Sequence, residues 1–226
     1  MHQCRAFTLI ETLVVTLIIG ILVSLGVMVA GRVTTKAAAA ETAHMMRQVG
    51  TAIQLYCNDH GGEFPRSSHS AYAYQQRGWA REILPYLGSE RDISNSAFKE
   101  FAARHYRSPL DKREDGVGFG LNSYFELDPS FDDYPGNPQT WRRIQSLPSP
   151  AHTVLMAEIK ETTRADHVMA HFWAGEGDAV EVAHDRHSGK AHYLFAEGHV
   201  ERLALEEVFK PSASVNLWNP SIAGAQ

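Results

Sequence analysis

An uninterrupted apolar segment near the N-terminus limits what this chain can fold into more than any other feature. Residues 12–31 contain no charged side chain. A helix needs about 20 residues, at about 1.5 Å each, to cross the apolar core of a bilayer. Arg5 precedes the segment, and a basic residue there favours a cytoplasmic N-terminus with the rest of the chain exported. The sequence therefore predicts a single-pass membrane helix.

Glu11 lies at the start of this segment and does not fit a simple anchor. A carboxylate inside a membrane helix costs about 2.5–3.5 kcal/mol on insertion scales. Acids in such positions are rare and generally have a function. We therefore treat Glu11 as a candidate functional residue.

Residues 6–11, which read AFTLIE, and the apolar run after them resemble the cleavage and methylation site of type IV prepilins and type II secretion pseudopilins. The resemblance implies that prepilin peptidase cuts between Ala6 and Phe7 and methylates the new amine of Phe7. It also implies that Glu11 pairs with the N-terminus of a neighbouring subunit during assembly. Ala6 departs from the family, in which glycine is usual at this position.

Three other kinds of N-terminus fit the sequence less well. A secretory signal peptide would be cut after the apolar segment, but Met28 occupies a position of that site where a small residue belongs. A plain signal anchor would leave Glu11 without a role. A lipoprotein cysteine follows its apolar segment, whereas Cys4 precedes this one.

Composition narrows the functional classes further. The formal net charge is −5 and there is no run of Lys and Arg, so nucleic acid is not expected as the primary partner. Removal of the leader takes Cys4 away and leaves Cys57 as the only cysteine, so the domain must be held by its core and not by a disulfide. No G-x-S-x-G, H-E-x-x-H or phosphate loop occurs, and we expect no enzymatic activity.

The expected fold is α+β and pilin-like, with a long N-terminal helix packed on a small antiparallel sheet. Apolar residues at helical spacing continue to Tyr56, and Gly61, Gly62 and Pro65 supply the stop. Short strands are expected within 118–127 and 153–158. The expected organisation is a leader (1–6), a transmembrane helical half (7–31), a domain-packed helical half (32–60), a globular domain (61–208) and a C-terminal tail (209–226).

The C-terminal third predicts a β-hairpin with Glu197-Gly198 as a two-residue turn, which places Phe195 opposite Val200. His187, followed by nine residues and then Glu197-Gly198, resembles a His-(nine)-Asp-Gly segment near the C-terminus of many pilin-like proteins. Glu197 replaces the usual Asp. The resemblance indicates relatedness to these proteins and implies no biochemical activity. We interpret His187 and Glu197 as a structural pair joined by a hydrogen bond.

A bound metal is the competing explanation of these histidines. His184, His187 and Glu197 are the candidate ligands for a divalent ion, although the histidine spacing matches no closed zinc site. Asp128, Asp132 and Asp133 offer oxygen ligands for Ca²⁺ without EF-hand spacing. No cofactor is therefore expected, and a structural divalent ion is left open.

The favoured function is that of a structural subunit of a type IV pilus or a type II secretion pseudopilus. The implied partners are prepilin peptidase, other pilin or pseudopilin subunits, the inner-membrane assembly platform and the membrane. The implied location is the inner membrane with a periplasmic C-terminal domain, followed by a periplasmic pseudopilus or an extracellular pilus. The alternative is a membrane-anchored periplasmic binding or metal-dependent domain with a prepilin-like anchor.

Overall fold

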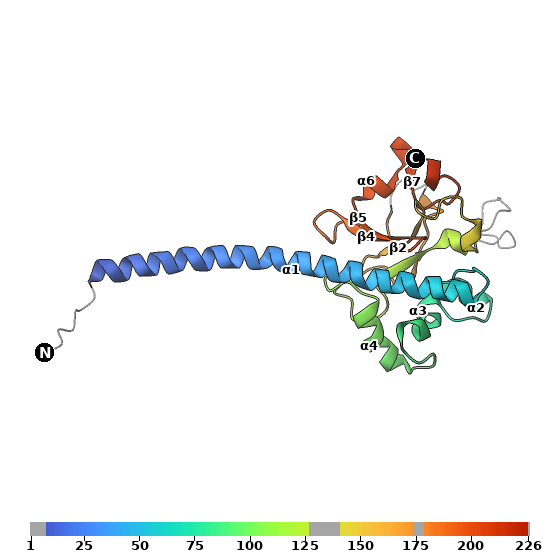
Figure 1. Ribbon diagram of the computed structural model, residues 1–226, viewed down its shortest axis with the longest axis horizontal. Helices are drawn as coiled ribbons and strands as arrows, with labels where there is room; N and C mark the ends of the chain where they lie inside the picture. The colour runs from blue at the N-terminus through green and yellow to red at the C-terminus, as the bar shows by residue number, and fades with distance from the viewer. Residues whose placement is uncertain (1–7, 127–140, 174–178, 226) are drawn as a thin grey trace. The chain divides into compact units, whose positions relative to one another are not determined.

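The computed structural model describes residues 8–126, 141–173 and 179–225, and it describes the backbone but not the side chains of residues 25–33. The chain divides into two compact units, residues 1–38 and residues 39–226. One helix, α1 (Leu9–Asp59), contributes to both units. The remaining elements all belong to the second unit (Figure 1).

Helix α1 ends where the sequence predicts. No proline occurs before Pro65, and the alanine-rich stretch at 37–40 favours helix. Gly61 and Gly62 both have positive φ, +64° and +88°, and the Gly62 N–H donates to the carbonyl of Cys57 at 2.7 Å. Glycine adopts this left-handed backbone without steric strain, so it closes the last turn of the helix. The predicted long helix is confirmed over Leu9–Asp59.

The first unit presents apolar side chains along the start of α1. The large apolar residues with exposed side chains are Leu9, Ile10, Leu13, Val14, Val15, Leu17, Ile18, Ile19, Ile21, Leu22 and Val23. Within the described parts of the chain, no helix has the length and apolar character needed to cross a membrane. The predicted membrane span is therefore not supported and stays a prediction.

The second unit contains a five-stranded sheet in the order β3-β1-β2-β4-β5. Its strands are β1 (Phe119–Asn122), β2 (Val154–Glu158), β3 (His167–Val168), β4 (Ala191–Phe195) and β5 (Val200–Leu203). Only the β1–β3 pair is parallel, and the other pairs are antiparallel. The expected fold class, a long N-terminal helix with a small and mostly antiparallel sheet, is confirmed.

Both faces of the sheet are buried. On one face, Met46, Val49 and Ile53 of α1 belong to a core that includes Met156 and Leu194 of the central strands. On the other face, a second core contains the sheet residues Val154, Ala157, Tyr193 and Phe195 together with Trp173 and Trp218. Because both faces are covered, β2 and β4 are buried at every position.

Short helices and strands surround this centre. In Figure 1, α2–α4 lie on one side of the C-terminal part of α1, and α6 and β7 lie on the other. The remaining elements are α2 (Ser68–Ala73), α3 (Trp79–Glu82), η1 (Leu84–Leu87), α4 (Asn95–His105), η2 (Ser123–Phe125), η3 (Ile144–Ser146), α6 (Leu205–Val208), β6 (Phe209–Lys210), η4 (Pro211–Ala213), β7 (Val215–Asn216) and η5 (Ala223–Ala225).

The C-terminal segment differs from the predicted tail at 209–226. Phe209 and Trp218 are buried, with 4% and 0% of their surface exposed. The Val154 N–H donates to the Leu217 carbonyl at 2.8 Å, and Asn122 Nδ2 donates to the Trp218 carbonyl at 2.8 Å. Residues 209–218 therefore help to cover the second face of the sheet. Burial of the large apolar ring of Trp218 stabilises this position.

The hairpin register also differs from the prediction by one residue. Leu194, and not Phe195, lies opposite Val200. The loop comprises residues 196–198, and Gly198 (φ +108°) donates its N–H to the Phe195 carbonyl at 2.9 Å. Three-residue hairpin loops commonly place glycine at a final position with positive φ. A shift of one residue exchanges the two faces of a strand, so Val200 lies beside Leu194 against α1.

Helix α1 lies close to this hairpin at Gly50. A Cβ atom at Gly50 would lie 2.7 Å from Leu194 Cδ1 and 3.6 Å from the Gly198 carbonyl. One turn further along, Gln54 Nε2 donates to the Ala196 carbonyl at 2.6 Å. The missing side chain at Gly50 therefore allows α1 to approach β4 and the hairpin loop.

We expect Gly50→Val to lower the free energy of unfolding by about 1–3 kcal/mol, because the added methyl groups overpack a filled core. Thr51→Val is the matched control, since Thr51 is exposed on the same helix and should change stability by about 0.5 kcal/mol or less. Urea unfolding of both variants measures the difference. Equal stability of the two variants would contradict the close packing at Gly50.

Candidate functional site

The N-terminal candidate site begins with a capping box at the start of α1. The Thr8 N–H and the Thr8 hydroxyl donate to Glu11 Oε2 at 2.8 and 2.7 Å, and the Glu11 N–H donates to Thr8 Oγ1 at 3.3 Å. This reciprocal pairing satisfies N–H groups that have no partner within a helix. Ala6 and Phe7 lie outside the described residues, and so does the predicted cleavage point.

The capping box leaves part of the Glu11 carboxylate available. Both Thr8 bonds reach Oε2, and within the described part of the chain no bond to Oε1 is found. Glu11 can therefore cap its own helix and accept a cation at the same time. The box also makes Leu9 the first residue of α1, shortly after the predicted cleavage point.

A second candidate site lies at one end of the central strands, around the carboxylate of Glu158. Glu158 ends β2, His192 lies on β4, and His187 lies in the turns that precede β4. His187 Nε2 is 3.1 Å from Glu158 Oε1, and His192 Nδ1 is 3.0 Å from Oε2. The His192 N–H donates to Oε2 at 2.9 Å, and all three residues are at most 3% exposed. We call these three residues the Glu158 cluster.

The Glu158 carboxylate is ionised although it is fully buried. Burial alone would raise its pKa, but hydrogen bonds from His187 and His192, and the charge of His187, lower the pKa to about 2. A buried carboxylate is tolerated only when such donors surround it. The cluster therefore joins the ends of β2 and β4 through one anionic centre.

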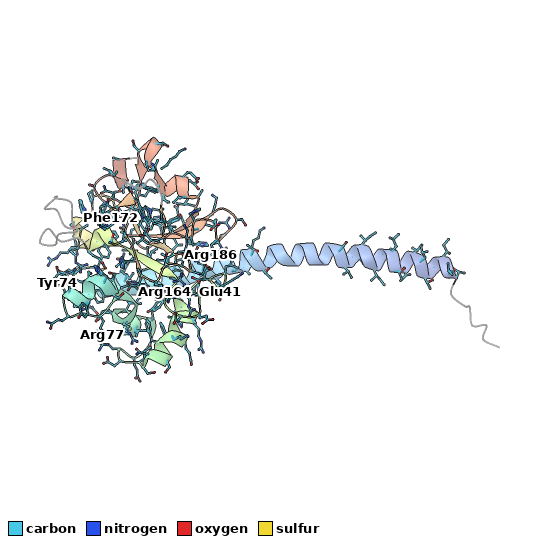
Figure 2. The ribbon with its side chains drawn as sticks, turned by 180° about the vertical axis from the view of Figure 1, so that it is seen from behind. Glu41, Tyr74, Arg77, Arg164, Phe172 and Arg186 are labelled. Atoms are coloured by element: carbon cyan, nitrogen blue, oxygen red, sulfur yellow. The ribbon has the colours of Figure 1, made fainter. Side chains whose placement is uncertain are left out.

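Arg186 connects the Glu158 cluster to further charged groups, and Figure 2 labels this residue. Its guanidinium lies 3.4 Å from Glu158 Oε1, 3.1 Å from Glu161 Oε1 and 3.6 Å from Asp111 Oδ2. It also donates to the Ile159 carbonyl at 2.9 Å. Asp111 in turn pairs with Arg113 at 2.9 Å. The buried acids are thus held by two guanidinium groups.

The structure does not form the predicted pair of His187 and Glu197. His187 bonds to Glu158, whereas the exposed Glu197 pairs with His199 at 2.9 Å on the hairpin. The prediction is wrong because the loop places Glu197 in solvent and a carboxylate from another strand takes its place. Gly198, the third structural candidate, ends the three-residue hairpin loop with a positive φ.

The structure brings together only part of the predicted metal ligands. His184 is only partly buried and does not belong to the Glu158 cluster, so of the three candidate ligands only His187 is part of it. The Ca²⁺ candidates Asp128, Asp132 and Asp133 lie outside the described residues.

Sequence reasoning missed Glu158 and His192 as functional candidates. A weak signal existed, since Glu158 is an acid at the end of the apolar strand VLMAE.

A second buried carboxylate, Glu126, has a local structural role. It accepts hydrogen bonds from the N–H and the hydroxyl of Ser67, and the neighbouring Ser68 N–H donates to Asp166 at 2.9 Å. Burial raises the pKa of Glu126, and the Ser67 bonds oppose this shift. These two acids fix the start of α2, because its first N–H groups need acceptors.

We expect Glu158→Ala to lower the free energy of unfolding by about 3–5 kcal/mol, since it leaves Arg186 and two imidazoles without their shared partner. Glu197→Ala removes an exposed carboxylate and should change stability by about 0.5 kcal/mol or less. Urea unfolding at pH 7 compares the two. A larger loss of unfolding free energy in Glu197→Ala than in Glu158→Ala would instead support the predicted pair of His187 and Glu197.

Comparison with known proteins identifies the N-terminal site. Residues 1–27 match a family model described as the prokaryotic N-terminal methylation motif. Searches of curated proteins and of solved structures each found no match. The resemblance of the C-terminal segment to the His-(nine)-Asp-Gly segment stays a prediction. The chain therefore carries the prepilin-type cleavage and methylation signal at its N-terminus.

Proposed function

We propose that this protein is a structural subunit of a type IV pilus or a type II secretion pseudopilus, matured by prepilin peptidase. The observation that carries the proposal is the methylation motif over residues 1–27, with Glu11 placed at the start of α1. The long helix and the small sheet after it suit a subunit that assembles through its N-terminal helix. An ordinary membrane anchor needs no such processing signal, and the alternative of an anchored binding or metal-dependent domain is not favoured.

Processing and assembly imply a defined set of partners. Prepilin peptidase cleaves between Ala6 and Phe7 and methylates Phe7, and the inner-membrane assembly platform then incorporates the subunit beside other pilins or pseudopilins. Before assembly the subunit resides in the inner membrane with its C-terminal domain in the periplasm. After assembly it belongs to a periplasmic pseudopilus or an extracellular pilus. The proposed role requires no cofactor and no catalytic residue.

Glu11 supplies the charge that drives assembly in this proposal. Opposite charges about 4 Å apart attract by about 4 kcal/mol at an effective dielectric constant of 20. That attraction is comparable with the cost of about 2.5–3.5 kcal/mol for an acid in a membrane helix. The N-terminal amine of a neighbouring subunit provides the cation only after cleavage before Phe7. The capping box uses only Oε2 of Glu11, and no partner of Oε1 is found among the described residues, which supports this pairing.

The first prediction is that the mature chain starts at Phe7 with a methylated amine. Mass spectrometry of the N-terminal peptide from purified membranes measures this directly. Cells without prepilin peptidase provide the control and should retain Met1 or the initiator-processed leader. A mature N-terminus near Gly31 would contradict the proposed function.

The second prediction is that Glu11→Gln leaves leader cleavage intact but lowers incorporation into filaments by about tenfold or more. Glutamine can still form the capping box with Thr8 but carries no charge, so the variant separates the two roles. Sheared filaments and inner membranes are compared by immunoblot. Thr12→Val is the control for a polar change at the next position. Normal incorporation of Glu11→Gln would remove Glu11 from the assembly step.

A further inference from the structure

We propose that Glu158, His187 and His192 form a binding site for one divalent transition-metal ion of the zinc class. One carboxylate oxygen and one ring nitrogen from each histidine lie within 4.8 Å of one another. Zn²⁺ prefers these donors, and two histidines with one glutamate make up a common three-ligand set. The ligands come from β2, from the turns before β4 and from β4 itself. A single ion can therefore contact three separate chain segments.

The two distances from the carboxylate oxygen to the ring nitrogens need little adjustment to hold such an ion. Glu158 Oε2 lies 3.0 Å from His187 Nε2 and 3.0 Å from His192 Nδ1. Tetrahedral Zn²⁺ with bonds of about 2.0–2.1 Å separates neighbouring donors by about 3.4 Å. The carboxylate oxygen and each ring nitrogen would move apart by about 0.4 Å, and each ring would carry its proton on the nitrogen that faces away from the ion.

Hydrogen bonding alone leaves the ring of His187 incompletely satisfied. Within the described parts of the chain, His187 Nδ1 is buried without a hydrogen-bond partner. Native proteins pair nearly all of their buried polar atoms, so a histidine in this state calls for a further explanation. A metal bond at Nε2 would place the ring proton on Nδ1 and would leave that atom without a partner, so the case for the ion rests on the arrangement of the three donors and not on this atom.

The net charge around the cluster is compatible with a bound cation. Asp111, Glu158 and Glu161 face the guanidinium groups of Arg113 and Arg186, which leaves a net charge of −1 around the cluster when the histidines are neutral. A divalent ion would change that charge to +1, which is no further from neutrality. Arg186 lies near Oε1 of Glu158, and this placement leaves Oε2 directed at the imidazoles.

A cavity lies next to Glu161, which pairs with Arg186. A cavity of about 390 Å³ is lined by Arg113, Arg164 and Glu161, among others. Glu161 pairs with Arg186, and Arg186 contacts Glu158, so Arg186 connects one residue of the cavity wall to the cluster. An ion bound there would fasten β2 to β4, the kind of cross-link that a processed chain with one cysteine cannot obtain from a disulfide.

The test uses the full chain in detergent, stripped with a chelator and then titrated with ZnCl₂. We expect about one Zn²⁺ per chain by elemental analysis, a higher Tm with bound ion, and Co²⁺ absorption bands typical of nitrogen and oxygen ligands. His187→Gln and His192→Gln should each weaken Zn²⁺ binding by at least about tenfold. Glu197→Gln, the matched control outside the cluster, should bind as the wild type does.

Wild-type protein that takes up no Zn²⁺ after stripping and titration would overturn the proposal. That arm does not depend on whether any variant folds. Uptake that is equal in wild type, His187→Gln and His192→Gln, with all three folded by circular dichroism, would also overturn it. The result is independent of leader cleavage and filament assembly, so failure of this site leaves the proposed function standing.

Discussion

The second unit of this protein depends on the burial of one helical segment against one face of its sheet. Met46, Val49, Ala52 and Ile53 have no exposed surface, and they occur at the three- and four-residue spacing of a helix face. Gly50 on the same segment permits close approach to β4. The first part of the same helix carries the methylation motif and exposed apolar side chains. One element thus combines the signal for processing with the core of the domain.

A buried carboxylate complements this apolar contact at the end of the sheet. Glu158 stays ionised in the interior because donors from His187, His192 and Arg186 surround it, so its desolvation is offset by bonds that also join β2 to β4. Cys57 provides no cross-link, since it is free and buried, and burial raises the pKa of its thiol to about 12. Core packing and the Glu158 cluster together take the place of disulfides.

The sequence was sufficient for the features that depend on local patterns. Apolar spacing and the Gly61-Gly62 stop predicted the end of α1 to within one residue, and residues 6–11 predicted the motif that the family model matches. Features that depend on contacts between distant parts of the chain could not be predicted from the sequence. Glu158 precedes His187 by 29 positions, and only the antiparallel pairing of β2 with β4 brings them together.

Two other differences have equally physical reasons. The hairpin register depends on whether Ala196 belongs to the strand or to the loop. The positive φ of Gly198 favours a three-residue loop that includes Ala196. The C-terminal residues read as a tail because they lack long periodic runs. Trp218 is buried against the second face of the sheet, and this packing cannot be predicted without knowing that the face is otherwise exposed.

Native-state hydrogen exchange on the full chain tests most directly whether residues 46–57 of α1 are integral to the domain core. We predict that their amides exchange only through global unfolding, with the same opening free energy as the amides of 154–158 and 191–195. Exchange of 46–57 through a separate opening of much lower free energy, while the strands stay protected, would contradict it. The sheet would then be a domain that folds without its helix.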